Sequence, residues 1–357
     1  MLYIVLATGQ CNLRCRYCGG SFPPSLVPWS VQYPIEDLKR LIESDPEAIV
    51  ALYGGEPLMN PEFVRTVLDE VKARRYVIQT NGLLVDRLEP EYWRRFDAVL
   101  LSIDGVREVT DYYRGEGVYD AVLRSAKWLR KAGFAGDLIA RMALSERSDV
   151  YRDVTHLLSL GLFDHVHWQL DVVWSDRWED FDSWAERYKE GLSKLARLWL
   201  SEMRRGRALG IVPFLGVAKV ALFGAGGGLP CGAGRDAFAI STDGRILACP
   251  IAVQEKWAEV GRLGEVKGPE DIRGSVQIGE PCTSCEYYRY CGGRCLYAYK
   301  ERLWGDEGFE RVCDLTRHLV DEVLVAVPEI RRLVERGIID PEELHYPPFN
   351  NTTEVIP

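Results

Sequence analysis

The chain lacks the segments that would export it or anchor it in a membrane. Residues 1–10 are apolar, but no basic segment precedes them, and the run is too short for the apolar part of a secretory signal. No stretch of about eighteen apolar residues is present to span a bilayer. We therefore expect a cytoplasmic protein with no membrane partner. Thiols stay reduced in that compartment, so its ten cysteines are not expected to form disulfides.

An excess of positive charge is also missing. The 44 Lys and Arg residues are outnumbered by 53 Asp and Glu residues, which gives a net charge of −9, and no basic stripe interrupts the mixture. This balance argues against nucleic acid as a partner. With 357 residues, 47% of them apolar, the chain can bury a large core and is long enough for one large domain with a smaller one beside it.

The first half of the sequence repeats a strand followed by an amphipathic helix. Strands are expected at residues 2–8, 48–53, 76–79, 98–102, 137–142 and 165–170. Helices are expected at residues 34–43, 61–71, 118–131 and 150–160. This alternation predicts an α/β fold with a parallel sheet. Six units rather than eight predict a partial (β/α)6 TIM-like barrel that is open on one side for a large substrate.

The cysteines fall into two groups. Cys11, Cys15 and Cys18 lie just after the first expected strand, and the other seven lie between residues 231 and 313. Three thiolates leave one corner of a [4Fe–4S] cluster free to bind something else. Structural zinc is an alternative for the later group, because Cys282-x2-Cys285-x5-Cys291-x3-Cys295 supplies four thiolates. Zinc there would leave Cys231, Cys249 and Cys313 unexplained, so we prefer iron–sulfur clusters.

Polar residues follow several of the expected strands at their carboxyl ends, where the ligand site of a parallel sheet lies. A Gly-Gly pair allows a close approach of backbone to ligand, a carboxylate can accept hydrogen bonds from an amine, and a guanidinium can bind a carboxylate with two hydrogen bonds. Together with an open iron site, these groups fit a bound amino acid. The residues are Gly54, Gly55, Glu56, Ser102, Asp104 and Arg141.

The cysteine triplet, with aromatic Tyr17 before its last member, resembles the signature of the radical S-adenosylmethionine (SAM) superfamily, and residues 54–57 resemble that family's motif for the methionyl amine. The resemblance covers residues 1–170. It implies that Cys11, Cys15 and Cys18 hold a catalytic [4Fe–4S] cluster. It further assigns Tyr17 to the adenine of SAM, Gly54, Gly55 and Glu56 to the amine, and Ser102 and Arg141 to the carboxylate. Asp104 would either support that loop or touch the cofactor.

The later cysteines resemble the SPASM extension of peptide-modifying radical SAM enzymes, which binds two auxiliary [4Fe–4S] clusters. The resemblance gives the inner cluster Cys231, Cys249 and Cys295, and the outer cluster Cys282, Cys285, Cys291 and Cys313. Seven thiolates cannot fill eight corners, and Ala237 stands where full-ligand members carry the eighth cysteine. The inner cluster is then either open at one iron or closed by another ligand, for which Asp236 is a candidate.

Four ranges follow from these motifs. They are a radical SAM partial barrel (1–175), a helical bridge and linker (176–230), a small cysteine-rich SPASM domain (231–315), and C-terminal helices with a tail (316–357). Asp243-Gly244 predicts a hairpin turn between strands at 237–240 and 245–248. Pro328 is expected to separate two helices, at 315–327 and 329–336. The tail from residue 345 is either disordered or packed across the open barrel.

The resemblance implies an enzyme that cleaves SAM reductively to a 5′-deoxyadenosyl radical and abstracts hydrogen from a peptide or protein, with a flavodoxin- or ferredoxin-type electron donor. Only ten residues precede Cys11, so we expect the peptide to be recognised by a separate protein or directly in the cleft. The alternatives are an enzyme acting on a small molecule or cofactor precursor, and a non-catalytic electron carrier. Sulfatase-maturating members of the family carry an Asp directly after the cysteine that corresponds to Cys249, where its carboxylate can act as a base. Pro250 stands at that position here, so sulfatase maturation is not expected.

Overall fold

The computed structural model describes residues 1–171, 178–224 and 226–347. These residues form two compact units. The first unit comprises Met1–Ile103, Thr110–Ile139 and Cys231–Gln277, and the second comprises Asp104–Val109, Ala140–Pro230 and the residues from Ile278 onward. The expected boundary at residue 175, part of the expected linker and residues 348–357 of the expected tail lie outside the described residues.

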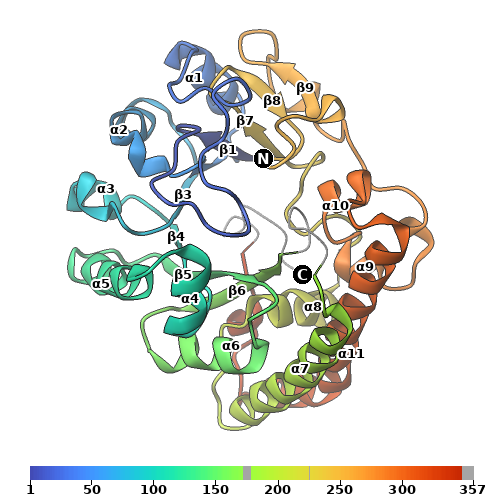
Figure 1. The fold of residues 1–357 in the computed structure, drawn as a ribbon. Helices are drawn as coiled ribbons and strands as arrows, with labels where there is room; N and C mark the ends of the chain where they lie inside the picture. The colour runs from blue at the N-terminus through green and yellow to red at the C-terminus, as the bar shows by residue number, and fades with distance from the viewer. Residues whose placement is uncertain (172–177, 225, 348–357) are drawn as a thin grey trace. The chain divides into compact units, whose positions relative to one another are not determined.

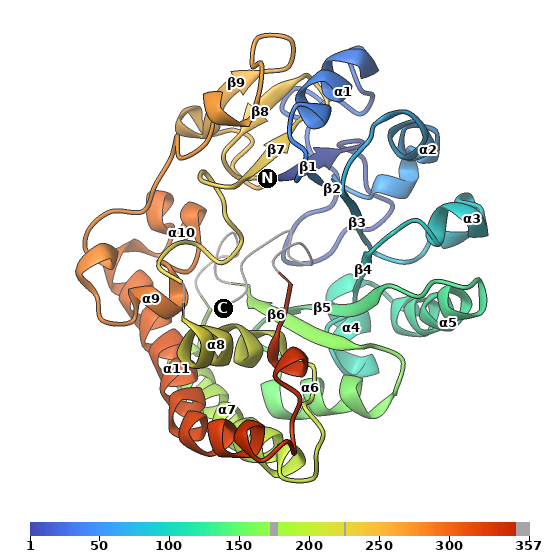
Figure 2. The same ribbon diagram turned by 180° about the vertical axis from the view of Figure 1, so that it is seen from behind.

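A sheet of mainly parallel strands forms the centre of the first unit. Its strand order is β4-β3-β2-β1-β7-β8-β9, in which β1 to β4 and β7 run parallel. The bounds of the strands are β1 Leu2–Leu6, β2 Ile49–Tyr53, β3 Arg75–Thr80, β4 Ala98–Ser102, β7 Ala237–Ile240, β8 Arg245–Leu247 and β9 Glu259–Arg262. The helices are α1 Ile35–Glu43, α2 Pro61–Glu70, α3 Pro90–Trp93 and α5 Val118–Lys131, and they flank the outer side of the strands (Figures 1 and 2).

The central strands of this sheet are continuous apolar runs because both of their faces are covered. Every residue of β1 and of β4 is buried. Such runs are typical of parallel strands that are buried on both faces. Asn60 ties the sheet to α2: its side-chain oxygen accepts a hydrogen bond from the N–H of Phe63 at 3.3 Å, and its amide donates to the carbonyl of Ala7 at 2.9 Å. The helix cap therefore also fixes the chain where β1 ends.

The second unit is mainly helical. Strand β5 (Asp137–Leu144) begins in the first unit and ends in the second, where it neighbours β6 (His165–Leu170). Helix α4 (Arg107–Arg114) also crosses from one unit to the other. The remaining helices are α6 Val150–Ser159, α7 Phe181–Met203, α8 Val212–Phe223, α9 Tyr288–Cys291, α10 Leu296–Glu301 and α11 Gly305–Glu335.

The expected break at Pro328 is wrong, because α11 runs through that residue without interruption. A proline inside a helix removes one backbone hydrogen bond, and its ring crowds the preceding turn. Helix α11 packs along α7 and α8 and buries apolar side chains on both sides of the proline, among them Val323, Val327 and Ile330. This burial offsets the lost hydrogen bond. The expected domain boundary at residue 315 also falls inside α11.

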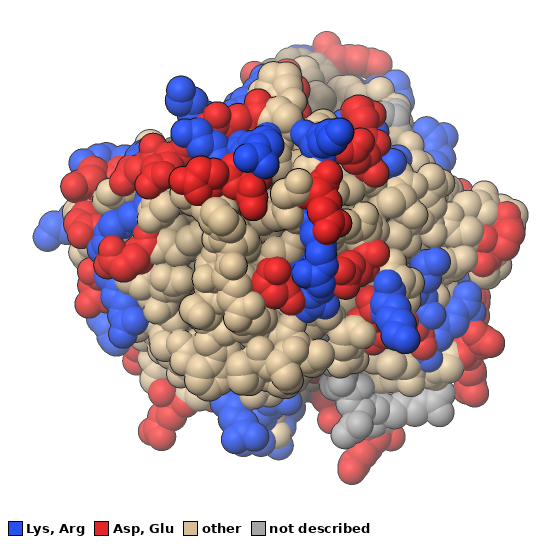
Figure 3. All heavy atoms as spheres, turned by 90° about the horizontal axis from the view of Figure 1, so that it is seen from above, with Lys and Arg blue, Asp and Glu red and all other residues tan. Residues whose placement is uncertain are grey.

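The predicted α/β fold with a parallel sheet is confirmed, and so is the antiparallel hairpin of β7 and β8. The pairing of β7 with β1 was not predicted; it extends the sheet with residues expected in the cysteine-rich domain. The four expected ranges stay predictions. On the face in Figure 3, acidic and basic side chains are intermixed. None of the helices in the described ranges is sufficiently long and apolar to cross a membrane.

Candidate active site

The N-terminal cysteines lie on the loop that leaves β1, and their thiols are close enough to affect one another. A hydrogen bond with the Cys15 thiol is the main cause that lowers the pKa of Cys18 to about 6, and the backbone N–H of Gly20 lowers it further. Burial raises the pKa of Cys11, although the N–H of Leu13 donates to its sulfur at 3.4 Å. Backbone N–H donors around thiolates are typical of iron–sulfur sites.

Gly54 and Gly55 hold this loop against the end of β2. The N–H of Gly55 donates to the Thr8 carbonyl at 3.0 Å, and the N–H of Glu56 donates to the Gln10 carbonyl at 2.7 Å. A Cβ atom on Gly54 would lie 2.4 Å from the Thr8 oxygen, and one on Gly55 would lie 2.2 Å from the Gln10 oxygen. The chain approaches so closely here that only glycine fits. The pair therefore positions the cysteine loop, in addition to the role at the amine that we predict.

Glu56 is a buried carboxylate, 1% exposed, that joins the ends of β2 and β3. It accepts hydrogen bonds from the Leu58 N–H at 3.0 Å, the Thr80 hydroxyl at 2.7 Å and the Asn81 N–H at 2.7 Å. Burial raises its pKa to about 7 in spite of these three donors. An ionised carboxylate has about four acceptor positions. One position is therefore left for a further donor, such as an amine.

An asparagine pair connects this region to the first cysteine. The side-chain amide of Asn81 donates to Asn12 at 2.7 Å and lies 4.0 Å from the Cys11 sulfur. The sequence analysis gave neither asparagine a role. Asn12 stands next to Cys11, and Asn81 stands directly after β3, where polar residues of such a sheet gather. These positions in the sequence were the signal from which a role at the site could have been predicted.

Aromatic side chains of α4 contact the rest of the cysteine loop. The ring of Tyr17 lies 5.7 Å from that of Tyr113, and the guanidinium of Arg114 lies 5.5 Å over the Tyr17 ring. Arg16 stacks on Tyr112 at 4.3 Å, and its Nε donates to the Tyr112 carbonyl at 2.8 Å. Helix α4 was not predicted, so these contacts were missed. They hold the predicted adenine contact, Tyr17, in a defined place.

The remaining residues predicted to bind SAM are divided between the two units. Ser102 is buried at the end of β4 in the first unit, whereas Asp104 and Arg141 belong to the second. Asp104 is fully buried and accepts a hydrogen bond from the N–H of Ala143 at 2.9 Å. This contact favours its supporting role. Arg141 donates to the side chain of Gln169. Their joint role at the cofactor stays a prediction.

Four later cysteines line one pocket in the second unit. Cys282, Cys285, Cys291 and Cys313 surround a cavity of about 100 Å³, together with Arg294 and Arg317. The thiols are near one another, since the charges of Cys313, Cys291 and Cys285 add to the burial that raises the pKa of Cys282 to about 11. In the described part of the chain no three His, Cys, Asp or Glu side chains converge as they would on a single ion. Four thiols around a cavity fit a larger inorganic group.

The three cysteines predicted for the inner cluster are also divided between units. Cys231 and Cys249 lie in the first unit and Cys295 in the second, so this grouping stays a prediction. Asp236, the candidate for the missing ligand, forms ion pairs with Arg235 at 2.7 Å and with Arg273. Its carboxylate is therefore already engaged. The buried residue after Cys249 is Pro250, which has no titratable group.

Residues 5–145 match the family described as the radical SAM superfamily. This part of the chain is therefore a radical SAM domain. The protein is a radical SAM enzyme, as the cysteine motif indicated. The family uses SAM and a [4Fe–4S] cluster, and the thiols of Cys11, Cys15 and Cys18 with their N–H donors fit such a cluster. The pocket of Cys282, Cys285, Cys291 and Cys313 fits a second one by the number and kind of its donors.

Mycofactocin maturase MftC of Mycobacterium tuberculosis is 28% identical to this chain in an alignment of 332 positions that covers 82% of this chain and 77% of the relative. A cysteine-type anaerobic sulfatase-maturating enzyme of Clostridium perfringens is 24% identical in an alignment of 335 positions that covers 82% of this chain and 88% of the relative. The solved structure of native anSMEcpe with bound AdoMet and a Cp18Cys peptide superimposes with a TM-score of 0.69 at 18% identity, covering 92% of this chain and 99% of the other. The last likeness concerns the fold.

Proposed function

We propose that this protein is a peptide-modifying radical SAM enzyme of the SPASM type, which abstracts hydrogen from a side chain of a peptide or protein. The observation that carries the proposal is the pair of thiol sites. One site has three cysteines and an adjacent carboxylate, and the other has four cysteines around a cavity. Relatives that match 82% of the chain are named maturases, which supports a peptide rather than a small molecule as the substrate.

The proposal includes three [4Fe–4S] clusters. The catalytic cluster is assigned to Cys11, Cys15 and Cys18, the outer auxiliary cluster to Cys282, Cys285, Cys291 and Cys313, and the inner auxiliary cluster to Cys231, Cys249 and Cys295. It also includes a flavodoxin- or ferredoxin-type protein that delivers electrons in the cytoplasm. With an iron open at the inner cluster, a substrate thiolate could bind there, which favours a cysteine-containing peptide.

The chain's own residues bind and orient the cofactor. When bound, the cluster and SAM supply a 5′-deoxyadenosyl radical. In our proposal Glu56 accepts a hydrogen bond from the methionyl amine at its remaining acceptor position, while Ser102 and Arg141 bind the carboxylate. Tyr17, held by Tyr113, contacts the adenine. Gly54 and Gly55 keep the cysteine loop close to Glu56, which places the proposed ligands of the cluster beside the proposed acceptor of the amine.

Anaerobic incubation of the reconstituted enzyme with a reductant and SAM tests the enzymatic part of the proposal. We expect 5′-deoxyadenosine, whereas an electron carrier would make none. Mass spectrometry of short cysteine-containing peptides that are co-expressed with the enzyme tests the substrate class. A mass loss of about two hydrogens in such a peptide is expected for a new thioether bond, and unchanged peptides with a modified small molecule would refute the peptide proposal.

A peptide with a Cys-x-Pro-x-Arg motif serves as the matched control in the same experiment. Maturation of this motif needs a base within hydrogen-bond reach of the substrate proton. Pro250 cannot act as that base, although it follows Cys249 at the position where sulfatase-maturating members carry an Asp. We expect no formylglycine in the control peptide. Its appearance would assign the enzyme to sulfatase maturation.

A further inference from the structure

Arg294 is a buried cation with unused hydrogen-bond donors. Its side chain is 2% exposed, and its Nε and Nη1 atoms have no hydrogen-bond partner among the described residues. Its guanidinium lies 5.6 Å over the ring of Phe309, which satisfies none of the N–H groups. A buried charge without a partner costs several kcal/mol, so such a group in a stable fold points to a ligand that completes it.

The backbone at Arg294 also has an unusual conformation. Three consecutive residues, Gly292, Gly293 and Arg294, have positive φ values of 59°, 88° and 65°. The first two suit glycine, whereas an arginine in this region is strained. The N–H of Arg294 donates to the carbonyl of Cys291 at 2.7 Å and closes the turn. The fold accepts strain at this residue and thereby places its side chain at the wall of the four-cysteine pocket.

Arg294 lies in the wall of the pocket that the thiols of Cys282, Cys285, Cys291 and Cys313 surround. Arg317 also lines the pocket, but its guanidinium is paired with Glu310 at 2.6 Å, and its side chain is about one-third exposed. The two arginines therefore differ: the guanidinium of Arg317 is paired with a carboxylate, whereas Nε and Nη1 of Arg294 have no hydrogen-bond partner among the described residues.

We propose that Arg294 donates hydrogen bonds from Nε and Nη1 to sulfur atoms of the cluster bound by Cys282, Cys285, Cys291 and Cys313, and thereby raises its reduction potential. A [4Fe–4S] cluster with four thiolates is negatively charged, and reduction by one electron adds a further negative charge. A buried cation stabilises the reduced form more than the oxidised form, and hydrogen bonds to sulfur act in the same sense. This makes the cluster a better electron acceptor. The inference rests on the proposed outer auxiliary cluster.

The test is a redox titration monitored by electron paramagnetic resonance, with dithionite as the electron source. It uses full-length protein in which Cys11, Cys15 and Cys18 are replaced by Ala, so that the catalytic cluster is absent. The signal that Cys282→Ser abolishes is the one followed. In Arg294→Gln we expect the equilibrium constant for one-electron reduction to fall at least about tenfold, equivalent to about 59 mV. In Arg294→Lys, which keeps the charge, this equilibrium constant should fall by a smaller factor.

Arg317→Gln is the matched control, because it removes a paired charge from the same pocket and should shift the potential by less than half as much. An unchanged potential in Arg294→Gln with full iron content would overturn the proposal. Iron loss in Arg294→Gln that Arg294→Lys restores would support it. Iron loss in both variants with loss of helical circular dichroism would overturn it in favour of a structural role. A wild-type pocket that binds no iron would refute the auxiliary cluster itself, and the inference with it.

Discussion

The two cysteine sites differ in how their thiols are surrounded. The N-terminal loop offers three thiols, of which Cys18 is exposed. Backbone N–H groups and the Asn81 amide lie near them, and the charge of Arg114 helps to lower the pKa of Cys18. The pocket in the second unit offers four thiols around a cavity, with Arg294 and Arg317 in its wall. Three thiols and an adjacent carboxylate suit a cluster that binds a cofactor, whereas four thiols with a buried cation suit one that stores an electron.

Removing the thiols of one site at a time tests this comparison with the largest expected effect. Replacing Cys11, Cys15 and Cys18 with Ala should remove about four irons per chain and all cleavage of SAM. Replacing Cys282 and Cys285 with Ser should remove about four irons as well, but leave SAM cleavage measurable as 5′-deoxyadenosine. Equal loss of cleavage in both variants would contradict separate roles for the two sites.

The glycine pair offers the next largest effect. Gly55→Ala would place a Cβ atom 2.2 Å from the Gln10 carbonyl oxygen, so the cysteine loop must move. We expect a destabilisation of about 1–3 kcal/mol by denaturant unfolding and loss of most of the N-terminal cluster. The matched control is Gly268→Ala, where the Cβ would meet the Ser44 side chain at an ordinary contact distance, 3.4 Å from its hydroxyl oxygen. A variant at Gly55 with full iron content would show that the loop is adaptable.

Glu56 gives a smaller, pH-dependent effect. Its raised pKa of about 7 means that the folded carboxyl is largely protonated at pH 6 and largely ionised at pH 8. The ionised form offers its remaining acceptor position to the amine, so the affinity for SAM should rise by about tenfold over this range. The amine of SAM itself titrates nearby, so the readout is the ratio of wild-type to Glu56→Gln affinities, measured by equilibrium dialysis. A ratio that does not change with pH would separate Glu56 from the amine.

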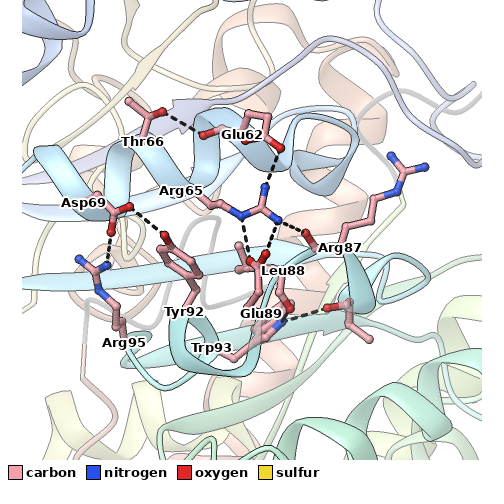
Figure 4. A network of polar contacts seen from close by, with 11 residues as sticks. Glu62, Arg65, Thr66, Asp69, Arg87, Leu88, Glu89, Tyr92, Trp93 and Arg95 are labelled. Carbon is pink, nitrogen blue, oxygen red and sulfur yellow. Dashed lines mark hydrogen bonds and ion pairs between the residues drawn. The ribbon is translucent and has the colours of Figure 1, made fainter.

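The smallest effect is expected at Arg65, an arginine that contrasts with Arg294. Figure 4 shows Arg65 between Glu62 and Glu89, to which it donates at 2.8 Å each, while Arg95 and Tyr92 meet on Asp69 nearby. These ion pairs are largely exposed and therefore screened by water. Arg65→Ala should lower the midpoint of thermal unfolding by less than about 3 °C and leave iron content unchanged. A larger shift would mean that this network stabilises α2 and α3 more than exposed pairs usually do.

The sequence predicted the parts of the fold that follow from local patterning. Strand β4, strand β6 and helix α5 have the predicted bounds. A continuous apolar run marks β4, an alternation of polar and apolar residues marks β6, and a helical period with a terminal glycine marks α5. Helix α4 was not predicted because it is short and strongly polar. Helix α11 continues through Pro328 because its packing on α7 and α8 outweighs the local effect of the proline.

For the site, the cysteine spacing, the place of Glu56 after an expected strand and the family resemblance led to the predicted residues, whose roles stay predictions. The roles of Asn12, Asn81 and Arg294 depend on contacts between distant segments, which no local pattern encodes. The same holds for the pairing of β7 with β1, which joins residues more than two hundred positions apart in one sheet. Charge pairing of Asp236 with Arg273 also became visible only in the folded chain.

Iron content of the anaerobically reconstituted wild-type protein, measured together with zinc, tests the central claim most directly. Two filled auxiliary sites and the catalytic site require about twelve irons per chain and no stoichiometric zinc. About four irons per chain would leave the later cysteines without clusters. Iron near zero with one zinc per chain would contradict the assignment of both cysteine sites.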